Sequence, residues 1–491
     1  MKRINELYSV KERPVKVMQY GEGNFLRGFA DYMIDIMNEK GVFNGNVLLV
    51  KPISVGSLQR FEDQQNVYTV ALRGMVDGEA KQIERVVTSV AGTVDCYGEY
   101  DRYIRGAENP DLRFVISNTT EAGIVYSETD TLDMTPPASF PAKLTQFLYR
   151  RAEYFDYAED KGLVMLPVEL IDDNGIMLHR CVVKLAQRWN LGERFMNWLE
   201  KACVFTSTLV DRIITGYPRG EDETLWEKWG YRDELIVTGE PFALWVIESE
   251  KDISGELPFE KAGLPVIFTD NQKPYKQRKV RILNGAHTSF VPASFLMGND
   301  TVGESMQDET VLAFIKKTLF EEVIPTLTLP KEDLLSFADA VLMRFRNPFV
   351  KHQLLSIALN SVSKWRARCM PSLLDYVKNE GGEKLPSCLA FSMAALIAFY
   401  STPESGEIAD GALTGRRGSE EYAIRDDAFA LQFFAGVKDL PAAEKAEKVL
   451  SNKDLWGQDL TEVAGFAAFV AAQLESIEKQ GMRNTVKALL G

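Results

Sequence analysis

A lysine, an asparagine and a histidine stand close together in one short segment, Lys279-Val-Arg-Ile-Leu-Asn284-Gly-Ala-His287. Apolar residues recur there at helical spacing, which predicts an amphipathic helix. Asn284 and His287 are three residues apart and would share one helical face, with the long side chain of Lys279 at the rim of the same arc. A base with a tunable pKa, an amide donor and an imidazole are the groups that a carbonyl-reducing site needs. On spacing alone, an exposed lysine and a core histidine are the more frequent explanation.

Three neighbouring residues are expected to affect the packing and the charge around this site. Gly285 in mid-helix costs about 1 kcal/mol relative to alanine, which predicts that backbone or ligand approaches closely there. A free lysine, with a pKa of about 10.4, is too basic to lose its proton readily near neutral pH. Burial in a domain cleft, together with Arg278 and Arg281, would depress the pKa of Lys279.

A glycine-containing turn follows the first predicted strand of the chain. The predicted strand Val15–Tyr20 runs directly into this turn, and a helix through Met37 follows. Glycines at a strand exit let the backbone approach a pyrophosphate, and the helix N-terminus offers free N–H groups. The predicted cofactor-binding residues of the turn are Gly21, Gly23, Asn24, Phe25, Arg27 and Gly28. The usual third glycine is replaced by Leu26, and Arg27 either pairs with a phosphate or lies on the helix surface.

The second predicted strand, Val47–Val50, does not decide between NAD and NADP. An NAD site usually has Asp or Glu at the end of this strand to bind the ribose hydroxyls. Here Lys51 and Pro52 follow it, and Lys51 could favour a 2′-phosphate. The residues leave the preference open.

Strand and helix signals alternate through the first half of the chain. Further strands are predicted at Arg113–Ser117 and Leu163–Val168. Val67–Arg73 and Arg85–Val90 are predicted to form an antiparallel pair that adds a mixed edge to the sheet. Strand–helix alternation with apolar strands predicts an α/β domain, residues 1–275, with a Rossmann-type doubly wound sheet.

From Lys279 onward the apolar pattern is almost all helical, which predicts a mostly α-helical C-terminal domain, residues 276–491. The predicted helices are Phe314–Val323, Lys331–Arg344, His352–Arg368, Cys388–Tyr400 and Leu460–Lys479. Ser401–Arg425 is polar and contains glycine, so we expect an exposed loop. The apolar run near Leu389–Phe399 is too short to span a bilayer and predicts a core helix.

Composition narrows the class of protein. The 491 residues carry a net charge of −14, which disfavours a nucleic-acid binder and requires a locally positive pocket for any anionic substrate. Five scattered cysteines predict buried thiols in a reducing cytosol. The N-terminus has no secretion signal, and we expect a cytoplasmic protein without membrane contact. Three histidines without HxH or HExxH spacing predict no metal site.

Several blocks together resemble the mannitol dehydrogenase family, a zinc-independent group of polyol-specific long-chain dehydrogenases and reductases. The blocks are GEGNFLRG (21–28), SNTTEAG (117–123), TLVDRI (208–213), KPYKQRKVRILNGAH (273–287) and RFRNP (344–348). The resemblance covers the chain from Val15 to about Tyr400. It implies an NAD-dependent oxidoreductase, and the phrases are most similar to those of members that interconvert D-tagaturonate and D-altronate in hexuronate (galacturonate) catabolism.

The resemblance also implies roles for single residues. Lys279 would be the general acid/base, and Asn284 and His287 would hold and polarise the reacting oxygen. A further carbonyl-binding asparagine of the family falls near Leu170, which cannot donate a hydrogen bond. Either Glu169 or a neighbour replaces it, or the oxyanion site is built differently.

The turn after Arg113–Ser117 is expected to face the cofactor. Asn118 and Thr119 would line it, and Glu121 would lie near the nicotinamide.

A hexuronate or hexonate substrate carries a carboxylate, which should find an arginine or lysine. The candidates are Lys276, Arg344, Lys364 and Arg368, with Arg344 and Lys364 ranked first because they lie in or beside family-like blocks. Each of them alone could equally be a surface charge or a structural ion pair.

Four further residues are expected near the site or at its margin. Asp211 and Arg212 would form a buried pair that braces the site or serves structure alone. His352 contacts substrate or packs in the helical core, and His179 is peripheral.

Three alternatives stay open: a fructuronate reductase, a mannitol-type polyol dehydrogenase and, from another class, a non-catalytic dinucleotide-binding sensor. The presence of Lys279, Asn284 and His287 together argues against the sensor. The oligomeric state and the physiological direction are not determined by these residues.

Overall fold

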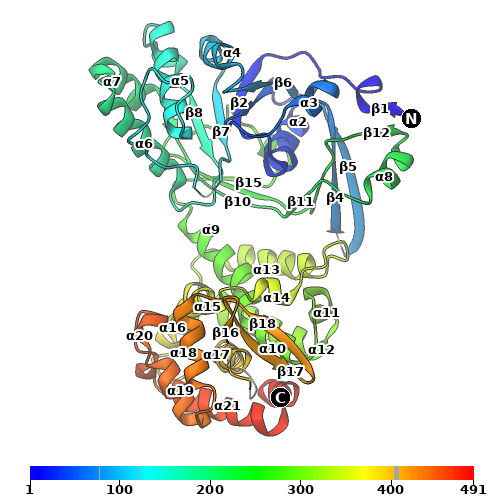
Figure 1. Cartoon of the computed structure of the whole chain (residues 1–491), viewed down its shortest axis with the longest axis vertical. Helices are drawn as coiled ribbons and strands as arrows, with labels where there is room; N and C mark the ends of the chain where they lie inside the picture. The colour runs from blue at the N-terminus through cyan, green and yellow to red at the C-terminus, as the bar shows by residue number, and fades with distance from the viewer. Residues whose placement is uncertain (77, 121, 403–407) are drawn as a thin grey trace. The chain divides into compact units, whose positions relative to one another are not determined.

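The computed structural model describes residues 1–76, 78–120, 122–402 and 408–491, and the chain divides into two units (Figure 1). Unit 1 comprises Met1–Gly74 and Lys81–Gln272, and unit 2 comprises Met75–Ala80 and Lys273–Gly491. Each unit has its own layers and its own core.

A six-stranded parallel sheet is the centre of unit 1. Its strands are β2 (Val15–Tyr20), β3 (Asn46–Lys51), β6 (Val90–Asp95), β7 (Phe114–Ser117), β8 (Val164–Pro167) and β9 (Val204–Phe205). They lie in the order β6-β3-β2-β7-β8-β9, and every pairing is parallel. Counted along the chain this is the 3-2-1-4-5-6 order of the Rossmann fold, which confirms the predicted sheet. The order reverses between β2 and β7, so ligands of this fold bind outside the carboxyl ends of these two strands.

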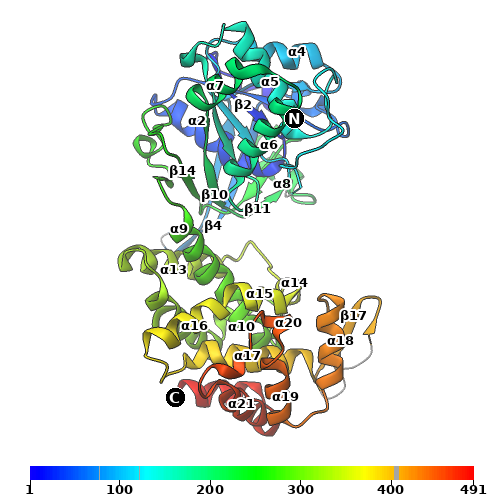
Figure 2. The ribbon, with the colours of Figure 1, turned by 90° about the vertical axis from the view of Figure 1, so that its left-hand side faces the viewer.

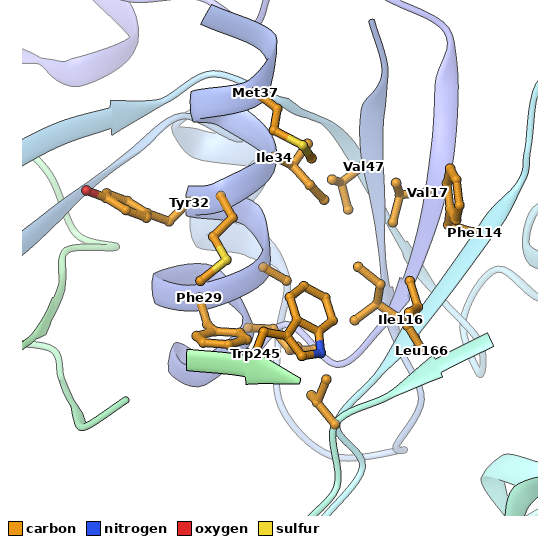
Figure 3. Close-up of a cluster of buried hydrophobic side chains, with 14 of the residues drawn as sticks. Val17, Phe29, Tyr32, Ile34, Met37, Val47, Phe114, Ile116, Leu166 and Trp245 are labelled. Carbon is orange, nitrogen blue, oxygen red and sulfur yellow. The ribbon is translucent and has the colours of Figure 1, made fainter. Parts of the chain in front are cut away.

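Helices cover both faces of this sheet, which explains why its strands are continuous apolar runs. On one face Phe29 and Met37, from the segment that includes α2 (Tyr32–Glu39), pack with strand residues and with Trp245 of β14 (Leu244–Glu248) (Figure 3). The other face is covered by α4 (Tyr100–Arg105), α5 (Phe140–Tyr154), α6 (Asn174–Arg188) and α7 (Gly192–Ala202). The two buried layers fix the sheet and hence the strand ends that carry the cofactor turns.

The predicted strand pair belongs to a separate sheet, so the expected mixed edge of the main sheet was wrong. β4 (Tyr68–Val76) and β5 (Glu79–Val87) are neighbours in the order β11-β13-β4-β5. The pair ends at Val87 because Thr88 N and Ser89 Oγ donate to the Asp35 carboxylate of α2, and the chain then enters β6. The other strands and α-helices of unit 1 are β1 (Lys2–Arg3), α1 (Asn24–Leu26), α3 (Gln59–Asp63), β10 (Ser207–Asp211), β11 (Ile214–Gly216), α8 (Asp222–Trp229), β12 (Tyr231–Arg232), β13 (Val237–Gly239) and β15 (Val266–Thr269). A π-helical turn, Arg27–Asp31, joins α1 to α2.

Unit 2 is built mainly of helices. These are α9 (Lys273–Arg278), α10 (Gly285–Leu296), α11 (Val302–Gln307), α12 (Glu309–Lys317), α13 (Lys331–Phe345), α14 (Leu354–Ile357), α15 (Ser361–Arg368), α16 (Met370–Asn379), α17 (Ser387–Tyr400), α18 (Ala428–Val437), α19 (Ala442–Leu450), α20 (Lys453–Trp456), α21 (Phe466–Gln480) and α22 (Met482–Leu490). Helix α17 is apolar and buried almost all round and packs against both α10 and α21 (Figure 2), which confirms the predicted core helix. In the described parts of the chain, no helix has the length and apolar character needed to cross a membrane.

Two predictions for unit 2 were wrong in detail. The expected helix His352–Arg368 is broken between α14 and α15 at Asn360, whose φ of 54° lies in the left-handed region that interrupts a right-handed helix. The expected loop Ser401–Arg425 contains the strands β16 (Ile408–Ala409), β17 (Ala412–Arg417) and β18 (Glu420–Ile424). Leu413 and Ile424 are buried on the inner face of this hairpin, but the alternation is too short and polar to stand out in the sequence.

Candidate active site

Lys279 and Asn284 begin and end a π-helical segment, Lys279–Asn284, and His287 follows in the first turn of α10. The prediction of a regular α-helix was therefore wrong for the first part. In a π-helix residue i bonds to residue i+5, so side chains five positions apart lie about one turn apart on the same face. Lys279 and Asn284 have this spacing, and the π turn moves Lys279 from the rim of the arc toward the face of Asn284. π turns often occur at functional sites.

Gly285 is the point where another helix crosses closely. A Cβ atom there would lie 3.2 Å from the carbonyl oxygen of Arg368, and the Cys369 thiol donates to the carbonyl of Gly285 at 3.6 Å. This confirms the predicted close approach of backbone. The close approach at Gly285 brings the end of α15 beside α10. There the Arg368 guanidinium donates to Thr288 Oγ1 at 3.4 Å.

The imidazole of His287 is enclosed but lacks a hydrogen bond at one nitrogen. Its Nε2 atom is buried without a partner among the described residues. The ring packs 4.2 Å from the ring of Phe345 and 5.4 Å from that of His352, measured between centroids. Because a core histidine normally satisfies both nitrogens, the open Nε2 indicates a position for a ligand group.

Three cations gather around His287. Burial lowers the pKa of His287 well below its usual 6.5, and His352, Arg344, Arg368 and Lys364 lower it further by their charge. We call Arg344, Lys364 and Arg368 the basic cluster. The structure thus brings three of the four predicted carboxylate ligands together with His287 and His352. In a chain of net charge −14, these three residues place positive charge beside His287, as an anionic substrate requires.

The basic residues nearer to Lys279 in sequence are engaged in other contacts. Arg281 forms an ion pair with Asp375 at 2.6 Å, so its charge is compensated there. The guanidinium of Arg278 lies over the ring of Phe337 at 4.5 Å. Lys276, the fourth predicted carboxylate ligand, lies half-buried on α9.

The glycine turn of unit 1 has the geometry of a dinucleotide site. Gly21 has a φ of +114°, and a Cβ atom there would lie 3.0 Å from the carbonyl oxygen of Asn118. At Gly23, which precedes the helix starting at Asn24, no atom lies within 4 Å of a Cβ position and no side chain caps the helix. At Gly28 a Cβ atom would meet the Ile214 side chain at 2.7 Å, so this glycine serves close packing. The turn therefore fits NAD, with open space and free N–H groups for the pyrophosphate.

Two predicted ligands of this turn make structural contacts instead. Arg27 is only 7% exposed and donates to the carbonyl of Leu235 and to Asn24 Oδ1, both at 2.7 Å. It does not lie on the helix surface, because its guanidinium is buried among protein acceptors. Phe25 stacks on Phe29 at 5.0 Å. These contacts hold the turn in shape, and a role of either residue in binding the cofactor stays a prediction.

The turn after β7 is braced by Glu169. The Glu169 carboxylate accepts from Thr119 N and Thr119 Oγ1, both at 2.9 Å, and from Ser117 Oγ at 3.1 Å. Asn118 N donates to Tyr20 O, which joins the ends of β7 and β2. Leu170 is 65% exposed. Glu169 is thus committed to positioning this turn; the predicted Glu121 lies outside the described residues.

One residue that sequence reasoning missed is Asn174, at the start of α6. Its Nδ2 donates to the carbonyls of Pro167, Glu169 and Thr208, and its Oδ1 accepts from Thr208 N. It joins the exits of β8 and β10. The polar run Asp-Asp-Asn-Gly after an apolar strand was the available signal.

Four further residues considered in the sequence analysis lie in unit 1, whereas the basic cluster belongs to unit 2. Arg212 donates to the backbone carbonyls of Gly28, Pro241 and Phe242, while Asp211 is buried at the end of β10. The suggestion that Lys51 binds a 2′-phosphate was wrong, since Lys51 is buried and pairs with Asp95 at 3.1 Å. His179 pairs with Glu200 at 3.0 Å on a partly exposed face. Within the described residues no three His, Cys, Asp or Glu side chains gather as metal ligands would, and all five cysteines are buried and free, as predicted.

A Rossmann sheet with an open glycine turn, and a lysine–asparagine–histidine face beside cations, define a nucleotide-dependent oxidoreductase. The mannitol dehydrogenase Rossmann domain model matches residues 15–261, and the mannitol dehydrogenase C-terminal domain model matches residues 271–478. The chain therefore belongs to the mannitol dehydrogenase family. It is an NAD-dependent oxidoreductase that acts on CH–OH groups.

Similar proteins match almost the full length of the chain. The altronate oxidoreductase of Escherichia coli O7:K1 is 45% identical, covering 100% of both chains. That of Pectobacterium carotovorum is 47% identical, covering 97% of each. A D-sorbitol dehydrogenase structure in substrate-free form has a TM-score of 0.82 at 19% identity, covering 99% of this chain and 100% of that one. The mannitol 2-dehydrogenase of Pseudomonas fluorescens, in a ternary complex with NAD and D-mannitol, has a TM-score of 0.67 at 21% identity, covering 98% and 96%. The two structures support the fold.

Proposed function

We propose that this protein interconverts D-tagaturonate and D-altronate with NAD(H), within hexuronate catabolism. The observation that carries the proposal is the basic cluster around the unpartnered Nε2 of His287, because a hexuronate presents a carboxylate next to several hydroxyls. A neutral polyol would need no such cluster. Full-length relatives at 45–47% identity that are altronate oxidoreductases support the same substrate class.

The proposed chemistry assigns one task to each side chain. NAD, held by the turn at Gly21 and Gly23 and by the turn after β7, supplies hydride exchange at the reacting carbon. Lys279, as an ammonium, protonates the oxygen when the ketone is reduced, and as a neutral amine it accepts that proton in the reverse direction. Asn284 donates an N–H to the developing oxyanion. His287, neutral because of its lowered pKa, bonds an adjacent hydroxyl through Nε2. These groups provide the proton and the oxyanion contact, so the proposal requires no zinc.

The test is NADH absorbance with the purified chain and D-tagaturonate, D-fructuronate or D-fructose, repeated with NADPH. We expect turnover of D-tagaturonate with NADH at the highest kcat/KM. Lys279→Ala should lower kcat by about 10²–10⁴, the usual contribution of general acid–base catalysis. Lys378→Ala, on an exposed part of α16, is the matched control and should retain activity.

Other outcomes would reassign the protein. Preference for D-fructuronate would identify a fructuronate reductase, and preference for D-fructose would favour a polyol dehydrogenase. Binding of NADH without turnover of any of the three substrates would favour the sensor.

A further inference from the structure

Unit 2 contains a cavity of about 670 Å³ at the far end of α10 from His287. Leu296, the last residue of α10, lines it. Nine residues separate Leu296 from His287, which corresponds to roughly 13 Å along a helix. The cavity is therefore distinct from the basic cluster, and the proposed reaction does not use it.

The charged wall of this cavity contains one ammonium group without a partner. Lys445 of α19 is 5% exposed, and within the described residues its side chain forms no hydrogen bond or ion pair. Burial lowers the pKa of Lys445, while Glu478 and Asp439, which also line the cavity, oppose this effect from beyond ion-pair distance. A buried ammonium without a hydrogen-bonded counter-charge is costly, and an anion in the cavity would compensate it.

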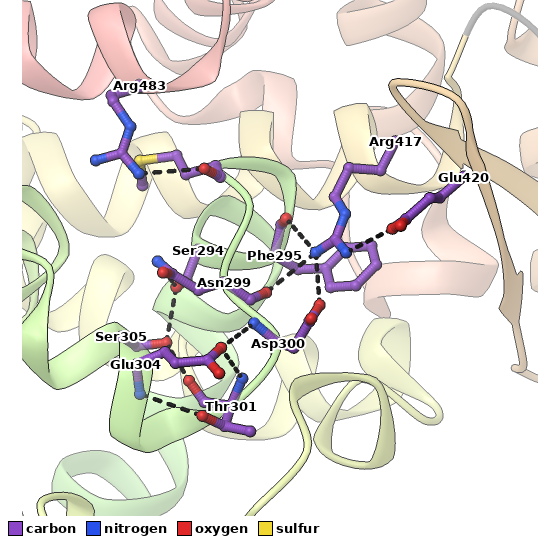
Figure 4. Close-up of polar contacts among 11 residues, drawn as sticks. Ser294, Phe295, Asn299, Asp300, Thr301, Glu304, Ser305, Arg417, Glu420 and Arg483 are labelled. Carbon is purple, nitrogen blue, oxygen red and sulfur yellow. Dashed lines mark hydrogen bonds and ion pairs between the residues drawn. The ribbon is translucent and has the colours of Figure 1, made fainter.

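The other cations of the cavity already have partners. Arg417 pairs with Asp300 at 2.8 Å and Glu420 at 3.0 Å and donates to the carbonyls of Phe295 and Asn299 (Figure 4). Because its guanidinium is already paired, Arg417 adds positive potential to the cavity but is not the group that would first bind an anion. Lys445 is the group with hydrogen-bonding capacity to spare.

The opposite wall is apolar. Leu474 and Ile477 of α21 and Met482 of α22 line it, together with Leu296. The volume exceeds what an inorganic anion would fill and lies in the range of small-molecule sites. We propose that this cavity binds a small organic anion with an apolar body, whose carboxylate or phosphate accepts hydrogen bonds from Lys445. This site is additional to the proposed oxidoreductase function.

Calorimetric titration of the full chain tests the proposal with three probes of similar shape: cyclohexanecarboxylate, cyclohexyl phosphate and the neutral cyclohexanecarboxamide. We expect at least one of the two anions to bind, and the amide to bind at least roughly tenfold more weakly, as for the loss of a charged hydrogen bond. Lys445→Met should weaken anion binding by at least roughly tenfold, whereas Lys445→Arg should preserve it. Lys448→Met, on the exposed face of the same helix, is the matched control.

Thermal unfolding without ligand supplies an independent readout. Lys445→Met should melt at a higher temperature than the wild type, because an unpaired buried charge is replaced by an apolar side chain of similar length. Failure of both anions to bind at millimolar concentration would overturn the proposal. So would binding that is unchanged in Lys445→Met, equal affinity for the amide, or a lower melting temperature of Lys445→Met accompanied by unchanged anion affinity.

Discussion

In the proposed function, His287 and the basic cluster would have complementary tasks in recognising a sugar acid. Because the pKa of His287 is lowered well below 6.5 by burial and by nearby cations, its imidazole is uncharged at neutral pH. It can bond a hydroxyl, but it cannot neutralise a carboxylate. The proposal assigns that task to Arg344, Lys364 and Arg368.

Replacement of Arg344 by methionine separates carboxylate recognition from catalysis. Arg344→Met should lower kcat/KM for D-tagaturonate by roughly 10–100-fold, the usual cost of losing a charge-assisted hydrogen bond. Residual turnover of D-fructose should change little, since that substrate has no carboxylate. Arg346→Met, two residues away and exposed, is the control. An equal loss for both substrates would show that Arg344 supports the fold or the reaction instead.

The chemistry-bearing residues could be predicted from sequence, but many of their contacts could not. Lys279, Asn284 and His287 were predicted from their types, their spacing and the family resemblance. The π-helical segment that contains the first two was not predicted, because the apolar spacing there also fits a regular α-helix. Arg27 and Lys51 were predicted near phosphates and are buried against protein acceptors. The direction of a long side chain is decided by tertiary neighbours that local spacing does not encode.

The helix that follows the glycine turn is joined to two strands by a buried carboxyl group, Asp31. Asp31 Oδ2 accepts from Tyr68 Oη of β4 at 2.8 Å and from Gln19 Nε2 of β2 at 3.4 Å. Burial raises the pKa of Asp31 from 3.8 to about 7, although Tyr68, Arg27 and Gln19 oppose the rise. The network therefore stores a proton in the native state that the unfolded chain releases at lower pH.

This predicts a pH dependence of stability. Between about pH 4 and pH 7 native Asp31 holds a proton that the unfolded chain has lost, so its contribution to the free energy of unfolding falls as pH rises through this window. Asp31→Asn keeps the shape and removes the titration. Denaturant unfolding from pH 4.5 to 7.5 should show the variant gaining stability relative to wild type as pH rises. A constant difference across the range would contradict this role.

Helix α17, the centre of unit 2, receives a cap from another element. The Glu322 carboxylate accepts from Cys388 N at 2.9 Å, Leu389 N at 2.8 Å and Ser387 Oγ at 3.2 Å, all in the first turn of α17. A buried carboxylate there satisfies free N–H groups and meets the positive end of the helix dipole.

Loss of this cap should destabilise unit 2. Glu322→Ala leaves two buried N–H groups without an acceptor, and we expect a loss of about 2–4 kcal/mol in the free energy of unfolding. Glu321→Ala, adjacent and exposed, should be nearly neutral. A loss below about 0.5 kcal/mol, the range of ordinary surface substitutions, would show that the cap is dispensable.

The elements themselves were predictable where their apolar residues stand close together. The strands β2, β3, β7 and β8 are mostly buried and α17 is a continuous apolar segment, so these stood out, whereas β6 and β9 were not predicted. The partner sheet of β4 and β5 did not stand out, because β4 pairs with β13, a strand far away in the chain, and local patterns do not encode such a pairing.

The division of the chain into two units, each with its own buried core, predicts two thermal transitions. The glycine turn lies in unit 1 and the Glu322 cap in unit 2, so one ligand and one variant can assign the transitions. In scanning calorimetry NADH at 100 times its Kd should stabilise the transition of unit 1 by about 2.7 kcal/mol. Glu322→Ala should lower the other transition and leave the first in place. A single transition that NADH and Glu322→Ala both move would show that the two units unfold as one cooperative body.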